Sequence, residues 1–230
     1  MIKKLFAGLI ALSLAACGSS SETQFINTAV TKTSANSNEL PMFLQAPPKA
    51  NLHLISIRLI RCGGALGTAV YIDSRGIFMT AHHVSEYEQC TDAISGKPLN
   101  TYYSDEENDF ALLSMDTKGD NRFVQTSCAG FVTGKTYYSV GFAKGYDLSI
   151  HKVVATNKYS GKDFVVDGIA RPNAHLRKLE GVLIQGMSGG AMIDLETGIV
   201  VGINNVTLPW TEAYSKELKD TVLCRKKGKN

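Results

Sequence analysis

The sequence predicts an all-β domain made of short strands. Apolar runs, each long enough for one strand, recur along residues 51–230, and polar turn sequences such as DSRG and LETG separate them. Regular spacing of short strands is typical of a β-sandwich or a β-barrel. The 230-residue length allows one hydrophobic core, or two small barrels that share a cleft.

Two hairpins are the most distinct elements of this pattern. Residues 67–72 and 77–80 flank the turn DSRG, and residues 190–194 and 199–205 flank LETG. Further strands are expected at 52–60, 110–115, 136–142, 151–156 and 164–169.

One helix is expected, at the C-terminal end of the domain. Thr211 is a residue type that caps helix N-termini. Tyr214, Leu218 and Val222 then recur at every fourth position, which places them on one face of a helix.

Residues 1–16 have the pattern of an export signal. The basic start MIKK precedes the apolar run LFAGLIALSLAA, which is too short for a permanent membrane-spanning helix. The following LAAC resembles the bacterial lipobox, which implies cleavage before Cys17 and lipid on its thiol. Gly18 is not the aspartate that retains some lipoproteins at the inner membrane, so the outer membrane is favoured, facing the periplasm or the surface. An ordinary secretory signal with a chance cysteine is the alternative.

Residues 17–50 are rich in Ser, Thr, Asn and Pro and are expected to form a flexible tether to the folded unit, residues 51–230. The net charge is +3, and removal of Lys3 and Lys4 with the signal leaves +1. A nearly neutral chain gives no indication of nucleic-acid binding.

Four cysteines remain when Cys17 is set aside. An even number in an exported protein predicts two disulfides, with three possible pairings. No C-x-x-C pair, H-E-x-x-H motif or His–Cys cluster indicates a metal site, and no cofactor is expected. The four are Cys62, Cys90, Cys128 and Cys224.

Ser188 lies in the run GMSGG, where three glycines surround one hydroxyl. Such a run is either a tight turn or a loop that presents the serine as a nucleophile. A serine hydroxyl needs a neighbouring base, nearly always a histidine. The histidine follows the serine in the nucleophile elbow of α/β-hydrolases, whereas all histidines here precede Ser188, so that class is excluded. The histidines are His53, His82, His83, His151 and His175.

An imidazole and a carboxylate occur in settings that suit catalysis. The stretch IFMTAHHVSE runs from a strand into a polar turn that carries His82 and His83. The stretch ENDFALLSM sets Asp109 directly before an apolar strand, so its carboxylate can be buried against an imidazole while the strand anchors in the core. The alternative for Asp109 is an acidic surface turn, but it alone abuts the apolar run.

These stretches together resemble the chymotrypsin-like serine endopeptidases, particularly their compact bacterial branch. GTAVYIDSRGIFMTAHHV is similar to the family's G-T-G-x-x-I…G-x-I-L-T-A-x-H-V block, NDFALL to D-I-A-L-L, and GMSGGAMID…GIVVGI to G-D-S-G-G-P-L-V…G-x-V-V-G-I. The resemblance covers nearly all of residues 62–205. It implies two six-stranded antiparallel Greek-key β-barrels within 51–230, with a boundary near 120–130.

The resemblance also implies the catalytic roles. His83 matches the general base, Asp109 the carboxylate that orients it, and Ser188 the nucleophile. The N–H groups of Gly186 and Ser188 match the oxyanion hole. A register shift of one residue would put His82 in the place of His83.

The primary substrate pocket is implied to lie between the segment before Ser188 and the segment after the GIVVGI strand. Val182 falls at its foot, and Asn204, Asn205 and Val206 along its wall. The foot carries no acidic residue, so a preference for Lys or Arg is not implied.

The cysteine pairing follows from the same resemblance. RCGGAL is similar to the family's C-G-G-S-L, whose cysteine bridges to one just past the catalytic histidine. This implies a Cys62–Cys90 disulfide and leaves Cys128 to pair with Cys224.

The implied activity is cleavage of peptide bonds in proteins or peptides through an acyl-enzyme, by an enzyme tethered to a bacterial envelope membrane. Met187 stands where the digestive members have an aspartate that receives a new N-terminal ammonium, so that kind of zymogen activation is not expected. The alternative is a catalytically latent or silent binding or adhesion module on the same fold.

Overall fold

The computed structural model describes residues 54–87, 89–161, 164–166, 169–170, 174–208 and 212–225. The expected signal, Cys17, the tether, Thr211 and the side chain of Val206 lie outside the described residues. None of the helices in the described ranges has the length and apolar character needed to cross a membrane.

The first half of the domain is a closed antiparallel barrel with the strand order β1-β2-β3-β6-β5-β4. A short helix, α4 (His82–Ser85), follows β3 directly. The strands are β1 (Ile57–Cys62), β2 (Ala65–Asp73), β3 (Ile77–Thr80), β4 (Cys90–Asp92), β5 (Pro98–Asp105) and β6 (Phe110–Ser114).

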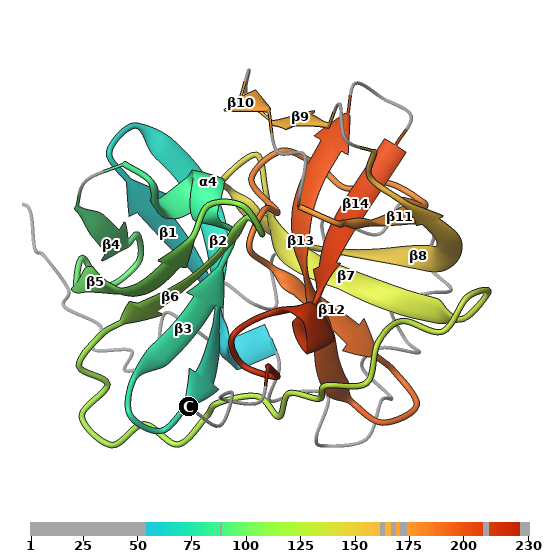
Figure 1. Cartoon of the computed structure of the whole chain (residues 1–230). Helices are drawn as coiled ribbons and strands as arrows, with labels where there is room; N and C mark the ends of the chain where they lie inside the picture. Colours follow the sequence, from blue (N-terminus) through green and yellow to red (C-terminus); the bar gives the residue numbers. More distant parts are fainter. Residues whose placement is uncertain are drawn as a thin grey trace, which may run out of the picture.

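The second half is another closed antiparallel barrel, with the order β11-β14-β13-β12-β7-β8. The small hairpin of β9 (Val165–Val166) and β10 (Ile169–Ala170) lies outside it. The two barrels lie side by side in Figure 1, and the prediction of two six-stranded barrels is confirmed. The barrel strands are β7 (Thr136–Ala143), β8 (Asp147–Tyr159), β11 (Arg177–Glu180), β12 (Ala191–Asp194), β13 (Ile199–Leu208) and β14 (Glu212–Glu217).

One apolar core joins the two barrels across the seam between them. Ile60 and Met79 of the first barrel belong to the same buried cluster as Val140, Ile193 and Ile203 of the second. Burial of these side chains stabilises each barrel, and it also stabilises the packing of one barrel against the other. Side chains from the two halves can therefore meet at the seam in a fixed geometry.

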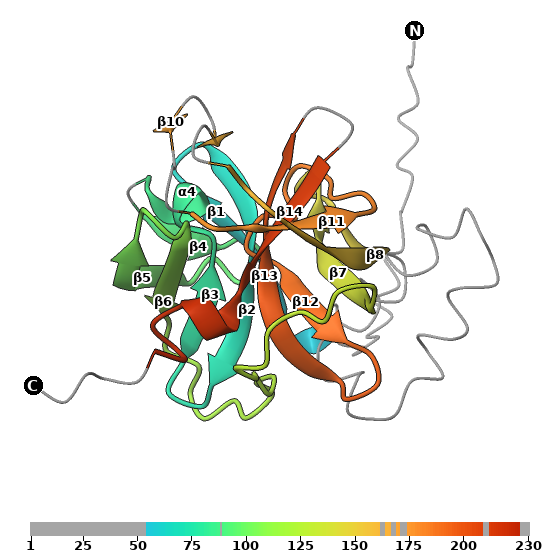
Figure 2. The same cartoon turned by 45° about the vertical axis from the view of Figure 1, so that its right-hand side comes forward.

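The predicted C-terminal helix is wrong. Residues Glu212–Glu217 form strand β14, and only Leu218–Asp220 are helical, as one 3-10 turn. Strand β14 pairs with β13 on one side and with β11 on the other, so barrel closure overrides the helical spacing of Tyr214 and Leu218. The 3-10 turn lies beside the first barrel (Figure 2), and Leu218 is part of the shared core.

Both predicted disulfides are present. Cys62 and Cys90 face each other across the antiparallel pair β1 and β4, so this bond closes the part of the chain that contains α4. Cys128 and Cys224 connect the segment between the barrels to the C-terminal segment.

Lys216 is a fully buried cation of β14 that reaches across the seam. Its ammonium donates to the side-chain oxygen of Asn108 at 2.8 Å and to the carbonyl of Ala174 at 2.7 Å. Burial disfavours the charged form and lowers the pKa of Lys216 from 10.5 to about 8.

This burial predicts a pH-dependent contribution to stability. Between pH 8 and 10.5 the unfolded chain keeps a proton on Lys216 that the folded chain has released, so folding becomes more favourable as the pH rises. Relative to Lys216→Met, the wild type should gain about 3 kcal/mol of unfolding free energy across this range. Urea unfolding of both proteins from pH 7.5 to 10.5 measures the difference, and parallel curves would contradict the prediction.

Candidate active site

His83, not His82, pairs with the predicted carboxylate. The Nδ1 atom of His83 lies 3.0 and 2.9 Å from the two carboxylate oxygens of Asp109, and the His83 backbone N–H donates to the first of these at 3.0 Å. The ring of His82 contacts the Ser104 hydroxyl at 2.7 Å instead. Because α4 begins immediately after β3, the end of this strand fixes where the imidazole lies.

Asp109 lies in a tight turn at the start of β6. Its φ of +49° is left-handed, a conformation that aspartate tolerates better than most residues. Asn108 braces the turn by donating from its backbone and side chain to the carboxylate of Asp105, at 3.0 and 2.8 Å. The turn therefore directs the Asp109 carboxylate away from water and toward His83.

The Asp109 carboxylate is fully buried and charged. Burial alone would raise its pKa, but the positive charge that His83 can carry, together with hydrogen bonds from His83 and Asn205, holds the pKa of Asp109 well below its usual range. Asp109 is therefore ionised at neutral pH and accepts a hydrogen bond from the imidazole.

Asn205 holds this carboxylate from the second barrel. Its amide nitrogen donates to the backbone oxygen of Asp109 at 2.8 Å and to the carboxylate at 2.9 Å, and its amide oxygen accepts the Lys216 N–H at 2.7 Å. The family resemblance implies a different place for this side chain, along the wall of the substrate pocket. The contact of Asn205 with Asp109 depends on how the two barrels pack against each other. The residues around Asn205 in the sequence do not indicate this packing.

Ser188 joins the same set of contacts. Its hydroxyl donates to the carbonyl oxygen of Asn205 at 2.8 Å, and its own carbonyl accepts the Thr68 N–H at 2.8 Å. Hydrogen bonds thus run from Ser188 through Asn205 and Asp109 to His83. The structure brings the three predicted catalytic residues to one place on the seam.

The glycines around Ser188 are required by close contacts with backbone. A Cβ atom on Gly189 would lie 2.1 Å from the carbonyl oxygen of Thr68, and one on Gly186 would lie 2.5 Å from that of Phe142. Gly190 is equally close to strand β7. Gly186 and Gly189 also have φ values of +93° and +83°. The run GMSGG is therefore pressed between the barrels and is not a free surface turn.

The loop that carries Ser188, residues 184–190, is here called the nucleophile loop. Its first five carbonyl oxygens all accept hydrogen bonds, which fixes the direction of successive peptides. In the described ranges, the N–H groups of Gly186 and Ser188 donate to no acceptor, which leaves two donors for a ligand. In chain order, the donors to the five carbonyls are Met187 N–H, Lys144 N–H, Thr68 Oγ1, Gly190 N–H and Thr68 N–H.

The expected pocket residues have different surroundings. Val182 is 60% exposed, so it lies at the surface rather than at a closed foot. Asn204 is fully buried, and its side chain bonds to the Ser139 hydroxyl and to the carbonyls of Val140 and Met187. Asn204 therefore holds the nucleophile loop through the Met187 carbonyl and does not line a pocket open to solvent.

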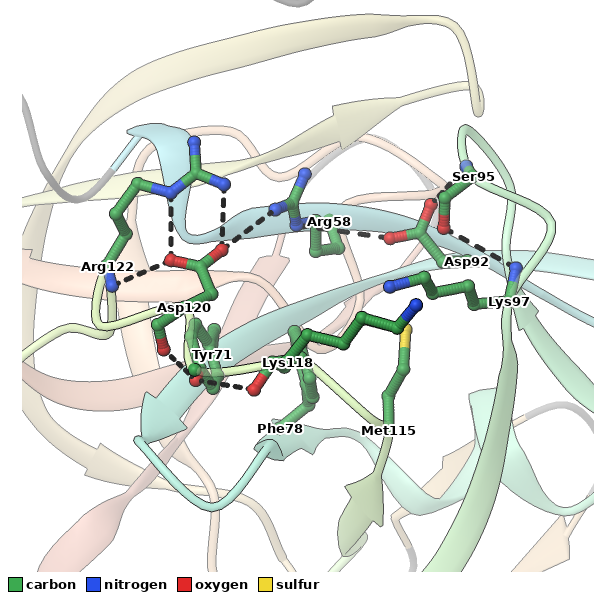
Figure 3. Close-up of a pocket in the computed structure, with 12 residues that line it drawn as sticks. Arg58, Tyr71, Phe78, Asp92, Ser95, Lys97, Met115, Lys118, Asp120 and Arg122 are labelled. Atoms are coloured by element: carbon green, nitrogen blue, oxygen red, sulfur yellow. Dashed lines mark hydrogen bonds and ion pairs between the residues drawn. The ribbon is translucent and has the colours of Figure 1, made fainter.

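No group of His, Cys, Asp and Glu side chains in the described ranges has the arrangement of a metal site. A pocket of about 430 Å³ lies elsewhere, on the first barrel (Figure 3). There Arg58 lies 3.9 and 4.0 Å from Asp92 and Asp120, and Tyr71 and Phe78 contribute aromatic surface. This pocket is at the end of the barrel where β3 begins and β6 ends, opposite the end that carries His83 and Asp109, so it is not part of the candidate active site.

Several solved structures share the two-barrel fold. The Rv3671c protease of M. tuberculosis, in its inactive form, has a TM-score of 0.63 at 18% identity, covering 74% of this chain and 87% of that one. The serine endoprotease from Yersinia pestis has a TM-score of 0.59 at 18% identity, covering 74% and 61%. The HtrA-type protease AlgW, solved with a tripeptide, has a TM-score of 0.60 at 19% identity, covering 75% and 60%.

At this identity the solved structures establish the fold alone, and this chain spans about six-tenths of the last two proteins. No curated protein matches the sequence. Residues 67–203, however, match the sequence profile of the trypsin-like peptidase domain, and this range contains β3, α4, β6 and the nucleophile loop. Because the match covers more than half of the sequence, the chain belongs to the trypsin-like peptidase family.

Proposed function

We propose that this protein is a serine endopeptidase whose catalytic triad is His83, Asp109 and Ser188. The observation that carries the proposal is the set of hydrogen bonds that joins the three side chains through Asn205. A buried carboxylate on one imidazole nitrogen fixes the tautomer whose other nitrogen accepts a proton. The N–H groups of Gly186 and Ser188, which have no acceptor in the described ranges, supply the donors that an oxyanion needs.

The acylation step uses each of these groups. The Ser188 hydroxyl turns from the Asn205 carbonyl toward His83, which is a rotation about one side-chain bond. The Ser188 oxygen then attacks the carbonyl carbon of the scissile peptide bond while His83 accepts the hydroxyl proton. The N–H groups of Gly186 and Ser188 stabilise the oxyanion, each contributing about 3 kcal/mol to the transition state.

The second half of the reaction reverses the direction of proton transfer. His83 donates its proton to the leaving amine, which leaves an ester between the substrate acyl group and Ser188. His83 then takes a proton from water, whose oxygen attacks the ester, and the departing Ser188 oxygen recovers that proton. Asp109 stabilises the imidazolium in both halves and remains ionised throughout.

We further propose that Cys17 carries a lipid that tethers the enzyme to a bacterial envelope membrane, with protein or peptide substrates reached across residues 17–50. The lipobox-like LAAC sequence and the export pattern of residues 1–16 support this proposal. Tethering would raise the local concentration of enzyme near substrates in the same membrane.

Removal of the nucleophile is the first test of the catalytic proposal. Ser188→Ala should lower kcat on a generic protein substrate by about 10⁶-fold and abolish labelling by a fluorophosphonate probe. Mass spectrometry of the labelled wild type should place the probe on Ser188. A folded, disulfide-bonded wild type that neither cleaves nor labels would favour the latent or silent binding module instead.

The contact between Asn205 and Asp109 generates a second prediction. Asn205→Ala removes two hydrogen bonds from the Asp109 backbone and carboxylate, so Asp109 should hold His83 less accurately. We expect kcat to fall by up to about 100-fold, with a smaller change in KM. The double variant Ser188→Ala/Asn205→Ala should be no slower than Ser188→Ala alone, because the residues act as a unit. An unchanged kcat in Asn205→Ala would contradict this role.

The lipid anchor is tested separately from catalysis. In a bacterium that processes lipoproteins, the wild type should sediment with membranes and carry acyl chains on its N-terminal peptide. Cys17→Ser should be recovered in the soluble fraction with unchanged kcat. Membrane association of Cys17→Ser, or an unmodified Cys17 in the wild type, would refute the anchor.

A further inference from the structure

The nucleophile loop needs external support if its amides are to keep one orientation. Three of its seven residues are glycines, and Gly186 adopts a φ of +93°, so at these positions the loop lacks the side chains that usually restrict φ and ψ. Met187 is fully buried and uncharged, so it cannot hold the loop through an ion pair. The hydrogen bonds to its carbonyl oxygens therefore have to define the loop conformation.

Thr68 of β2 contacts this loop at two points from the other barrel. Its hydroxyl bonds to the Gly186 carbonyl at 2.8 Å, and its backbone N–H donates to the Ser188 carbonyl at 2.8 Å. Both contacts are buried, since Thr68 is fully inaccessible to solvent. Thr68 therefore spans the part of the loop that carries the two unused amides.

The direction of each hydrogen bond at the Thr68 hydroxyl is determined by its partners. The Phe142 N–H can only donate, and it lies 2.9 Å from the hydroxyl oxygen. The Gly186 carbonyl can only accept, so the single hydroxyl proton must point to it. The bridge from β7 through Thr68 to Gly186 thus has one possible arrangement.

The pinned carbonyl belongs to the peptide between Gly186 and Met187. This peptide joins the one that carries the Gly186 N–H to the one that carries the Ser188 N–H. The neighbouring peptides are bonded through the Gln185 and Met187 carbonyls, so fixing the middle peptide as well restricts the φ and ψ rotations on both sides of it. The Thr68 hydroxyl therefore acts on both amides at once.

Thr68 also connects the loop to the strand that leads to His83. The Thr80 hydroxyl, at the end of β3, donates to the Thr68 carbonyl at 2.8 Å. The same residue thereby contacts the nucleophile loop and the element that carries the imidazole.

We propose that Thr68 is the positioning residue that holds the nucleophile loop in the form competent to bind an oxyanion, so that this form depends on contact between the two barrels. The inference rests on the proposed endopeptidase function. It adds that the hydrogen bonds of the Thr68 hydroxyl, and not the shape of the Thr68 side chain, maintain this form of the nucleophile loop.

The test compares two substitutions at one position in the full chain. Thr68→Val keeps the shape of the side chain but removes the hydrogen bonds that the hydroxyl makes with the Gly186 carbonyl and the Phe142 N–H, and should lower kcat by about 100- to 1,000-fold, with KM changed less than about threefold. Affinity for a peptidyl aldehyde, whose adduct forms an oxyanion, should fall in parallel. Thr68→Ser restores the hydroxyl and should recover kcat to within about tenfold of the wild type.

A matched control separates positioning from a general loss of stability. Thr221 is also fully buried, and its hydroxyl donates to the Leu218 carbonyl at 2.8 Å, away from the loop. Thr221→Val should lower the unfolding midpoint without changing kcat. The proposal fails if Thr68→Val retains wild-type kcat, or if Thr68→Ser is as slow as Thr68→Val.

Hydrogen exchange gives a readout that does not need activity. The N–H groups of Met187 and Gly189 donate within the folded site, so a peptide spanning residues 184–190 should exchange faster in Thr68→Val than in the wild type or in Thr221→Val. Equal exchange in all three proteins would overturn the positioning role. A wild type that lacks hydrolysis but shows this exchange pattern would refute the endopeptidase function and leave the loop support standing.

Discussion

Hydrogen bonds across the seam between the barrels are the constraint on which the site depends. Thr68 of the first barrel holds the backbone around Ser188, and Asn205 of the second barrel holds Asp109. Each barrel therefore supplies a side chain that holds a candidate catalytic residue of the other barrel in place. The apolar core that continues from one barrel into the next fixes the relative position of the barrels, so the site is complete only when the two barrels are packed together.

The buried charge of Asp109 explains much of the chemistry around it. Burial of a charged carboxylate away from water is unfavourable unless several hydrogen-bond donors contact it. Here His83 supplies two hydrogen bonds and Asn205 a third, which together outweigh burial. The same donors align the imidazole, so the interactions that allow the charge to be buried also orient the base. Lys216 extends this polar cluster through Asn108 and the backbone of β14.

The sequence predicts those parts of the site that depend on local pattern. His83, Asp109 and Ser188 each lie beside an apolar strand in a recognisable block, and hydrogen bonds through Asn205 connect them in the structure. Asn205 and Thr68 act through contacts between distant strands, and nothing in their own neighbourhoods indicates this. The predicted C-terminal helix failed for a related reason: Tyr214, Leu218 and Val222 have helical spacing, but residues 212–217 are needed between β13 and β11 to close a barrel.

In the proposed mechanism, the Ser188 hydroxyl and the N–H groups of Gly186 and Ser188 form one preorganised site for acyl transfer. The most direct measurement is a crystal structure of the full chain with a peptidyl aldehyde bound. We expect a covalent bond to the Ser188 oxygen, with the oxyanion about 2.7–3.1 Å from the N–H groups of Gly186 and Ser188 and the Gly186 carbonyl still bonded to Thr68. An adduct whose oxygen points away from these amides, or the absence of a bond to Ser188, would contradict the proposed mechanism.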